Sequence, residues 1–162
     1  MSTTNALDEI LEFHWMMDML QTVDVGIVVL NRDFEIKVWN GFMEAHSGKL
    51  PSDVRDKTLF SLFPDISETW FRRKAKAVFE LRTRAFMTWE QRPYLFKFRN
   101  FRPITGTEPF MYQNISLSAL VSATGAVDHV CMMVYDMTDA ASAKKQLLAL
   151  QVEQSEMTQT LR

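Results

Sequence analysis

The chain has 162 residues, of which 47% are hydrophobic, and its formal net charge is -2. A chain of this size buries about two-thirds of its unfolded surface as one domain, and the apolar content excludes intrinsic disorder. The small net charge gives no sign of a nucleic-acid-binding protein. Cys131 is the only cysteine, which excludes an intramolecular disulfide and a cysteine-rich zinc site. No signal-peptide pattern or apolar stretch of membrane-helix length occurs, so we expect a cytoplasmic segment.

The first predicted element is a helix over residues 7–20 that is apolar on nearly every side. Such a helix needs burial on two faces. We expect one face to lie on the chain's own sheet and the other on a second copy, with Ile10 and Met17 at the dimer contact. Residues 1–22 are therefore assigned to an N-terminal helix that covers the sheet or forms a dimer.

Two short β-rich runs come next, on either side of a turn at residues 31–33, and they predict a hairpin. Asn40 is suited to cap a short helix that ends at Gly48. Pro51 begins another brief turn of helix, and residues 58–63 form an apolar run that ends before a proline.

Asp65 and Glu68 resemble a capping box and predict a longer helix that runs to about Leu81. The basic residues of this helix are most simply a solvated face, with phosphate or nucleic-acid contact as the alternative. They are Arg72, Arg73, Lys74 and Lys76.

After Arg84 the apolar period changes from 3.6 to 2, which predicts strands. The strands expected here are residues 86–91, 94–101, 111–122 and 127–137, with a loop over residues 102–109 and a turn at Thr124 and Gly125. Together the elements indicate an α+β fold in which helices lie between two groups of strands of an antiparallel sheet.

The last strand passes into a helix without an intervening glycine or proline. Residues 130–135 are apolar in succession, as in a strand that is covered on both faces. Thr138 or Asp139 can cap the first turn of the helix that follows. We therefore expect a stiff joint through which the helix acts as a lever arm.

Apolar residues of this last helix recur at alternating steps of four and three, which is the seam of a two-stranded coiled coil. The seam comprises Ala143, Leu147, Leu150, Met157 and Leu161, with the polar Gln154 at one core position where it could fix the register. We expect Leu147, Leu150, Met157 and Leu161 to contact a second copy in a homodimer. A lone helix folded back on the sheet is the alternative.

The order of elements resembles the PAS fold, and three local motifs carry the resemblance. They are the Gly-apolar strand at residues 26–30, the Trp39-Asn40 pair and the Asp136-Met137-Thr138 ending. The resemblance spans about residues 23–139 and implies a five-stranded antiparallel sheet with short helices between strands two and three, plus flanking helices. It also implies sensing: a small ligand, cofactor or partner biases the terminal helices.

The same resemblance implies that Asp136 and Thr138 relay the signal into residues 140–162, a helix that begins a coiled coil leading to an effector. Residues 101–117 (FRPITGTEPFMYQNISL) look most like PAS domains that precede bacterial diguanylate cyclase modules with GGDEF motifs. By this resemblance the first candidate effector is a cyclase that makes cyclic di-GMP, and the second is a histidine kinase.

No arrangement typical of catalysis or metal binding occurs in the sequence. The three histidines lie far apart, and there is neither a Gly-Lys-Ser/Thr nor a His-Glu-x-x-His motif. Cys131 is interpreted as an inert apolar residue of a core strand. We therefore expect no catalytic residue and no metal site. A docking module with a filled core is the rival class, and a small enzyme using His46, His129 or Glu90 is a third.

The PAS types that carry a cofactor narrow the range of cofactors expected for this chain. The light-sensing flavin type has a reactive cysteine in a helix, and the comparable TLFSLFPDI segment has none, which excludes covalent photochemistry. The best-known heme type takes its iron ligand from the long helix, but residues 66–83 contain no histidine. His46 is better explained as a helix-end residue than as a heme ligand. The cofactor stays unknown, with a non-covalent flavin between aromatic residues still open.

A ligand pocket is a further hypothesis. One face of the strand YQNISLSAL carries Asn114, Ser116 and two more small or polar groups. If this face looks inward it offers hydrogen bonds to a small molecule, and if outward it is the wet side of the sheet. The candidate pocket residues are Phe42, His46, Phe60, Trp70, Phe79, Trp89, Phe96, Asn114, Ser116 and Met132.

Overall fold

The computed structural model describes residues 2–100 and 109–162, apart from the side chains of residues 2 and 3. Its helices and strands are, in chain order, α1 (Ser2–Thr22), β1 (Gly26–Asn31), β2 (Ile36–Trp39), α2 (Gly41–Ser47), α3 (Pro51–Val54), α4 (Leu59–Leu62), α5 (Glu68–Leu81), β3 (Ala85–Met87), β4 (Gln113–Val121), β5 (Val127–Asp136) and α6 (Thr138–Thr160).

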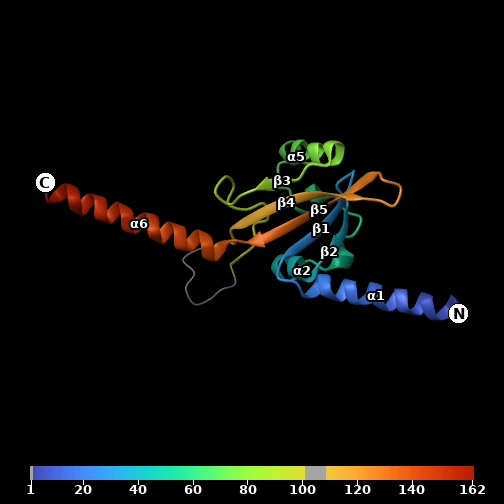
Figure 1. The fold of residues 1–162 in the computed structure, drawn as a ribbon. Helices are drawn as coiled ribbons and strands as arrows, with labels where there is room; N and C mark the ends of the chain where they lie inside the picture. Colours follow the sequence, from blue (N-terminus) through green and yellow to red (C-terminus); the bar gives the residue numbers. More distant parts are fainter. Residues whose placement is uncertain (1, 101–108) are drawn as a thin grey trace. The chain divides into compact units, whose positions relative to one another are not determined.

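The strands form one five-stranded sheet in the order β2-β1-β5-β4-β3 (Figure 1). Strand β1 lies between β2 and β5 and is antiparallel to both. The predicted α+β class, with an antiparallel sheet and flanking helices, is confirmed. The chain divides into two compact units, one of Met1–Phe86 with Ile115–Tyr135 and the other of Met87–Asn114 with Asp136–Arg162.

The core of the first unit lies on one face of its central strands. In the register of β1 and β5, Val28 pairs with Met132 and Leu30 pairs with Val130, and all four side chains are fully buried. Because strand residues alternate between faces, the positions between them point to the other side and are less completely covered. The near-continuous apolar run of β5 therefore places apolar side chains on both faces of the strand, and one face is buried more completely than the other.

Helix α2 packs closely over the start of β1, and Gly26 permits this approach. A Cβ atom at this position would lie 2.5 Å from Sδ of Met43 and 2.9 Å from Cβ of Val134. No side chain larger than hydrogen fits there without a shift of its neighbours. The Gly-apolar motif is thus explained by helix-on-strand packing.

Asn40 is the polar hub of the first unit and is fully buried. Its Nδ2 donates to the carbonyl oxygens of Leu20 (2.9 Å) and Val25 (2.8 Å), and its Oδ1 accepts from the backbone N–H groups of Ile27 (3.0 Å) and Met43 (3.4 Å). One amide thus joins the end of α1, the start of β1 and the start of α2. The predicted helix cap is confirmed and has these additional roles.

Other predicted boundaries hold with small changes. Gly48 ends α2 in the left-handed conformation, with φ of 72°, as a C-cap glycine does. Helix α5 is capped by Ser67, whose Oγ accepts from the N–H of Trp70, so the predicted capping role of Asp65 is wrong. Ser67 directly precedes the first helical residue, which is the position at which a side chain reaches the free N–H groups.

The strand predicted over residues 86–91 is shorter in the structure. Strand β3 ends at Met87, and the chain then turns, because the N–H groups of Gln91 and Arg92 both donate to the carbonyl oxygen of Thr88. Residues 88–92 are called the 88–92 turn below.

The strand predicted over residues 94–101 is wrong for its described part, residues 94–100. Its only ladder contact is an isolated bridge between Arg99 and Phe110. The alternation of apolar and charged residues has another cause: Phe96 and Phe98 are buried, with rings stacked 5.3 Å apart, while Lys97 and Arg99 are exposed. The loop predicted over residues 102–109 lies almost wholly outside the described residues.

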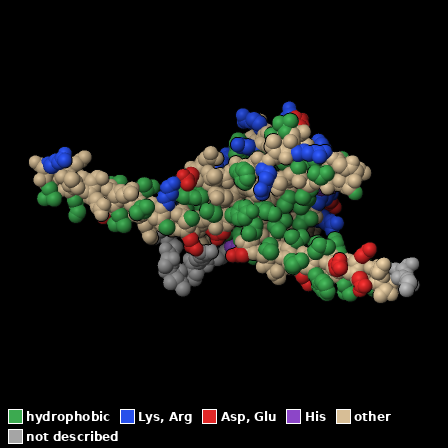
Figure 2. All heavy atoms as spheres, viewed as in Figure 1, with side chains coloured by type: hydrophobic (Ala, Val, Ile, Leu, Met, Phe, Trp, Pro, Cys, Tyr) green, Lys and Arg blue, Asp and Glu red, His purple; other side chains and the backbone are tan. Residues whose placement is uncertain are grey.

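The expected role of α1 in covering the sheet or forming a dimer stays a prediction. Most of its apolar side chains are exposed, and Figure 2 shows them open along the helix. The exposed set comprises Leu7, Ile10, Leu11, Phe13, Trp15, Met16 and Met19. Within the described part of the chain, no helix combines the length and apolar character that crossing a bilayer requires.

Replacement of Asn40 by alanine tests its role as the hub. We expect Asn40→Ala to lower the free energy of unfolding by about 2–4 kcal/mol, because buried backbone groups of Leu20, Val25 and Ile27 lose their partners. Urea denaturation measures the change. The control Asn5→Ala, on the exposed surface of α1, should alter stability by no more than about 0.5 kcal/mol. Equal effects of the two variants would contradict the assignment.

Candidate functional site

The start of α6 is held by a carboxylate outside the helix. The backbone N–H of Thr138 (3.0 Å) and its hydroxyl (2.6 Å) both donate to Oδ1 of Asp136. Thr138 is the first helical residue, so the prediction that Thr138 or Asp139 caps the helix is wrong. A hydroxyl-to-carboxylate bond is among the stronger protein hydrogen bonds, and negative charge at a helix N-terminus is favourable.

The same hydroxyl also binds the residue before β4. The N–H of Tyr112 donates to Oγ1 of Thr138 (3.1 Å), and the N–H of Met137 donates to the carbonyl oxygen of Tyr112 (2.7 Å). Thr138 is only 3% exposed. A buried hydroxyl used as both donor and acceptor fixes the position of the first helical turn against the start of β4. We call Tyr112, Asp136, Met137 and Thr138 the joint.

Gln113, the first residue of β4, organises the segment that sequence reasoning assigned to a strand. Its Oε1 accepts from the N–H groups of Leu95 and Phe96 at 3.1 Å, and its Nε2 donates to the carbonyl oxygen of Phe96 at 2.8 Å. The side chain is 1% exposed. A buried amide thus supplies the backbone partners that a neighbouring strand would otherwise provide.

The predicted pocket residues fall in both units. Phe42, Phe79, Phe96, Ser116 and Met132 are buried, whereas His46, Phe60, Trp70, Trp89 and Asn114 are half-buried. The rings of Phe42 and His46 lie 4.3 Å apart, and the N–H of Trp89 donates to Oδ1 of Asn114 at 2.9 Å. Phe60 belongs to an aromatic cluster with Phe34 and Phe71. As a set, these residues stay a prediction.

The polar face of β4 contains one group that the protein itself does not satisfy. Ser116 is 2% exposed, and its hydroxyl oxygen has no hydrogen-bond partner among the described residues. Asn114 already accepts a backbone hydrogen bond, and Ser118 is half-buried. Buried polar groups are nearly always paired, so the hydroxyl of Ser116 is the atom on this face most suited to a bound molecule.

Two surface hollows lie within the first unit. One, of about 460 Å³, is lined by residues of α1, β2 and α3, and it includes the predicted dimer residue Met17. The other, of about 240 Å³, lies beside α5 and is lined by Arg32, Arg72, Lys76, Glu80 and two phenylalanines, of which Phe79 is a candidate pocket residue. Arg72 is paired there with Glu68 of its own helix at 2.8 Å, as on a solvated face.

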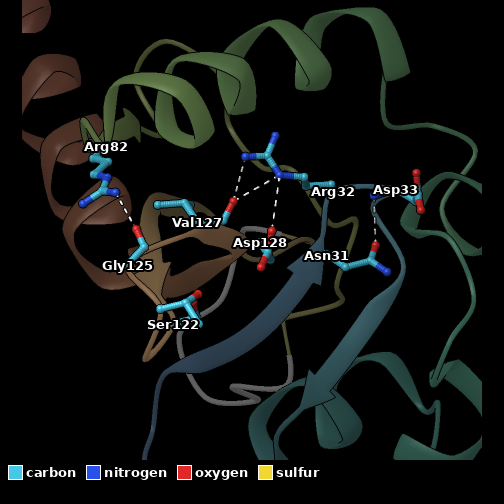
Figure 3. A network of polar contacts seen from close by, with 9 residues as sticks. Asn31, Arg32, Asp33, Arg82, Ser122, Gly125, Val127 and Asp128 are labelled. Carbon is cyan, nitrogen blue, oxygen red and sulfur yellow. Dashed lines mark hydrogen bonds and ion pairs between the residues drawn. The ribbon is translucent and has the colours of Figure 1, made fainter.

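Two arginines brace the turn between β4 and β5 (Figure 3). Arg32, in the turn between β1 and β2, donates from Nε and Nη2 to the carbonyl oxygen of Val127 at 3.1 and 2.8 Å and lies 3.8 Å from Asp128. Arg82, at the end of α5, donates to the carbonyl oxygen of Gly125. These side chains are engaged in structural contacts.

The chemistry expected of Cys131 agrees with its surroundings. The thiol is buried, and burial raises its pKa above the ordinary value, so little reactive thiolate forms near neutral pH. Among the residues that the structure describes, no group of three or more His, Cys, Asp or Glu could hold a metal ion.

The predicted coiled-coil seam is fully exposed in the single chain. All residues from 143 to 162 are exposed, and Figure 2 shows hydrophobic side chains open along α6. The exposed fractions reach 57% for Leu147 and Leu150, 63% for Met157 and 89% for Leu161. The contact of the seam with a second copy and the alternative of a helix folded back on the sheet both stay predictions. Leu148 and Val152 are also exposed but lie off the seam.

Sequence reasoning missed Tyr112 and Gln113 as functional residues. Tyr112 contributes to the joint through its backbone N–H and carbonyl oxygen, and such contacts leave no signal in residue type. Gln113 does leave one, because it stands in an alternating series with Ile115 and Leu117 whose side chains are buried. A glutamine at a core position of a strand indicates a buried polar contact.

No protein-family model matches the sequence, and a search of curated proteins found no match. A crystal structure of a sensory box sensor histidine kinase from Vibrio cholerae is similar, with 25% identity and a TM-score of 0.55, covering 84% of this chain and 98% of that chain.

Two structures of lower identity share the fold. The PAS domain of an HTR-like protein from Haloarcula marismortui is 15% identical, with a TM-score of 0.54, and covers 77% of this chain and 96% of that chain. The PAS domain of a protein from Colwellia psychrerythraea is 12% identical, with a TM-score of 0.54, and covers 78% and 98%, respectively.

Replacement of Thr138 by valine removes the hydroxyl and keeps the shape of the side chain. We expect Thr138→Val to lower the free energy of unfolding by about 1–3 kcal/mol, because the N–H of Tyr112 and the carboxylate of Asp136 lose a buried partner. Hydrogen exchange should also accelerate in the first turn of α6. Thr138→Ser keeps the hydroxyl and should retain most of the protection. Normal protection in Thr138→Val would show that the joint does not anchor the helix.

Proposed function

We propose, on the premise that this chain has the PAS fold, that it is a sensory or docking module of a signalling protein. Its state would be passed through α6 to an effector. The observation that carries this proposal is the joint: the buried hydroxyl of Thr138 ties the first turn of α6 to Asp136 and Tyr112. Beyond Ser142 the helix is exposed, as an outgoing connection must be.

For the effector, a histidine kinase is favoured over a diguanylate cyclase. The support is the similarity to the sensor histidine kinase from Vibrio cholerae, which extends over 98% of that structure. The likeness to cyclase-linked PAS domains rests on residues 101–117, of which residues 101–108 lie outside the described part of the chain. The cyclase is therefore the second candidate.

For the input, we favour a small molecule bound at Ser116, among the candidate pocket residues of the first unit. The buried hydroxyl of Ser116 supports this assignment, since it finds no partner among the described residues and would gain one from a ligand. A ligand shifts α6 only if it binds two arrangements of the helix with unequal affinity. The rival is a docking module in which a protein partner, and no small molecule, provides the input.

Native mass spectrometry with an absorption spectrum separates the two inputs. We expect the purified chain to carry a stoichiometric small molecule, and we expect Ser116→Ala to reduce its occupancy because a hydrogen bond is lost. Ser118→Ala, at a half-buried position on the same face, is the matched control. A protein that is empty and colourless, in both wild-type and variant form, would favour docking over ligand sensing.

A homodimer through α6 is the proposed form of the outgoing connection. An aspartate in the seam would place an unpaired carboxylate in an apolar contact, which costs about 3 kcal/mol or more and corresponds to roughly a 100-fold weaker dimer. We therefore expect Leu150→Asp to dissociate the protein in analytical ultracentrifugation. Leu148→Asp introduces the same charge off the seam and should leave the dimer intact. Loss of the dimer in both variants, or in neither, would refute the proposed seam.

A further inference from the structure

The second turn of α6 makes contacts that the joint does not include. Nζ of Lys144 donates to Oε2 of Glu90 at 2.8 Å and lies 5.6 Å from the ring centroid of Trp89. Nζ of Lys145 donates to the hydroxyl of Tyr112 and lies 4.6 Å from the centre of that ring. All five residues belong to the second unit.

The residues that receive the two lysines are themselves held in place. The rings of Trp89 and Tyr112 meet edge to face, with centroids 5.6 Å apart. The N–H of Trp89 donates to Oδ1 of Asn114 in β4, so the 88–92 turn is tied to that strand. Asn114 is therefore linked to Trp89 by a hydrogen bond, and Glu90 is the next residue in the chain. A movement of Asn114 would act on both.

We propose that Lys144, Lys145, Glu90, Trp89 and Tyr112 form a lysine latch that sets the rotation of α6 about its axis. The latch gives the 88–92 turn its own route to the helix, separate from the contact between Asp136 and Thr138. A regulatory role for the latch rests on the proposed relay function. The contacts that form the latch do not depend on that function.

The geometry explains why two adjacent lysines are needed. Successive residues of an α-helix project about 100° apart, so Lys144 and Lys145 reach different sides of the helix axis. One contact alone would leave the helix able to rotate around it. With both contacts made, a rotation of α6 separates Lys144 from Glu90, Lys145 from Tyr112, or both.

The latch is weak, as a reversible contact must be. The side chains of Lys144 and Glu90 are 46% and 56% exposed, so solvent and salt screen their attraction. An exposed pair of this kind changes an equilibrium by about 1.5- to fivefold. A ligand with a modest preference for one arrangement of the helix is enough to open it.

Charge reversal tests the latch by hydrogen exchange of the full chain, without ligand or effector. We expect Glu90→Lys to speed exchange in residues 141–148 by about two- to fivefold at low salt. The double variant with Lys144→Glu should recover the protection, because the pair is restored in reverse. The difference between Glu90→Lys and wild type should shrink in high salt.

Two controls keep the result specific. Glu153→Lys makes the same charge change at an exposed residue of α6, outside the latch, and should leave the exchange of residues 141–148 unaltered. Lys144→Gln removes the charge without reversal and should speed exchange if Glu90→Lys proves unfolded by circular dichroism. Wild-type exchange in Glu90→Lys, or no recovery in the double variant, overturns the latch. An absent ligand in mass spectrometry would instead overturn the ligand-sensing function and leave the latch standing.

Discussion

Backbone groups that are buried where regular structure ends still need hydrogen-bond partners, and this constraint organises the protein. Three buried side chains meet it. Asn40 serves the end of α1 and the starts of β1 and α2, Gln113 serves the residues after the 88–92 turn, and Thr138 serves the N–H of Tyr112 before β4. Each side chain supplies a hydrogen bond that the backbone of a strand or helix would otherwise provide. Because an unpaired buried amide is costly, these three side chains stabilise the backbone where they lie.

Local signals allowed most of the fold to be predicted from the sequence. The hairpin of β1 and β2, the short helices and the turn before β5 all follow from residues adjacent in sequence, such as Gly48 and Gly125 with their positive φ angles. The periodicity of α5 and the continuous apolar run of β5 both report burial directly. Asn40 was recognised as a cap for the same reason, since its first partner, Met43, is three residues away.

What could not be predicted depends on contacts between distant residues. The alternation around Phe96 and Phe98 is genuine, but the partner of that segment is the side chain of Gln113 rather than another strand. Helix α6 is not capped by Thr138, because the hydroxyl is directed to Asp136 and receives the N–H of Tyr112. Residue types alone also do not say which of the candidate pocket residues meet, and the structure divides them between two units.

The bond from Asn40 to the carbonyl oxygen of Leu20 has a mechanical consequence for α1. The helix is held at its carboxyl end, while the apolar side chains nearer its amino end are exposed. A force on the exposed portion would be transmitted in part to the amide of Asn40, which also holds α2 and β1. A partner bound to the amino-terminal part of α1 would therefore also act on α2 and β1.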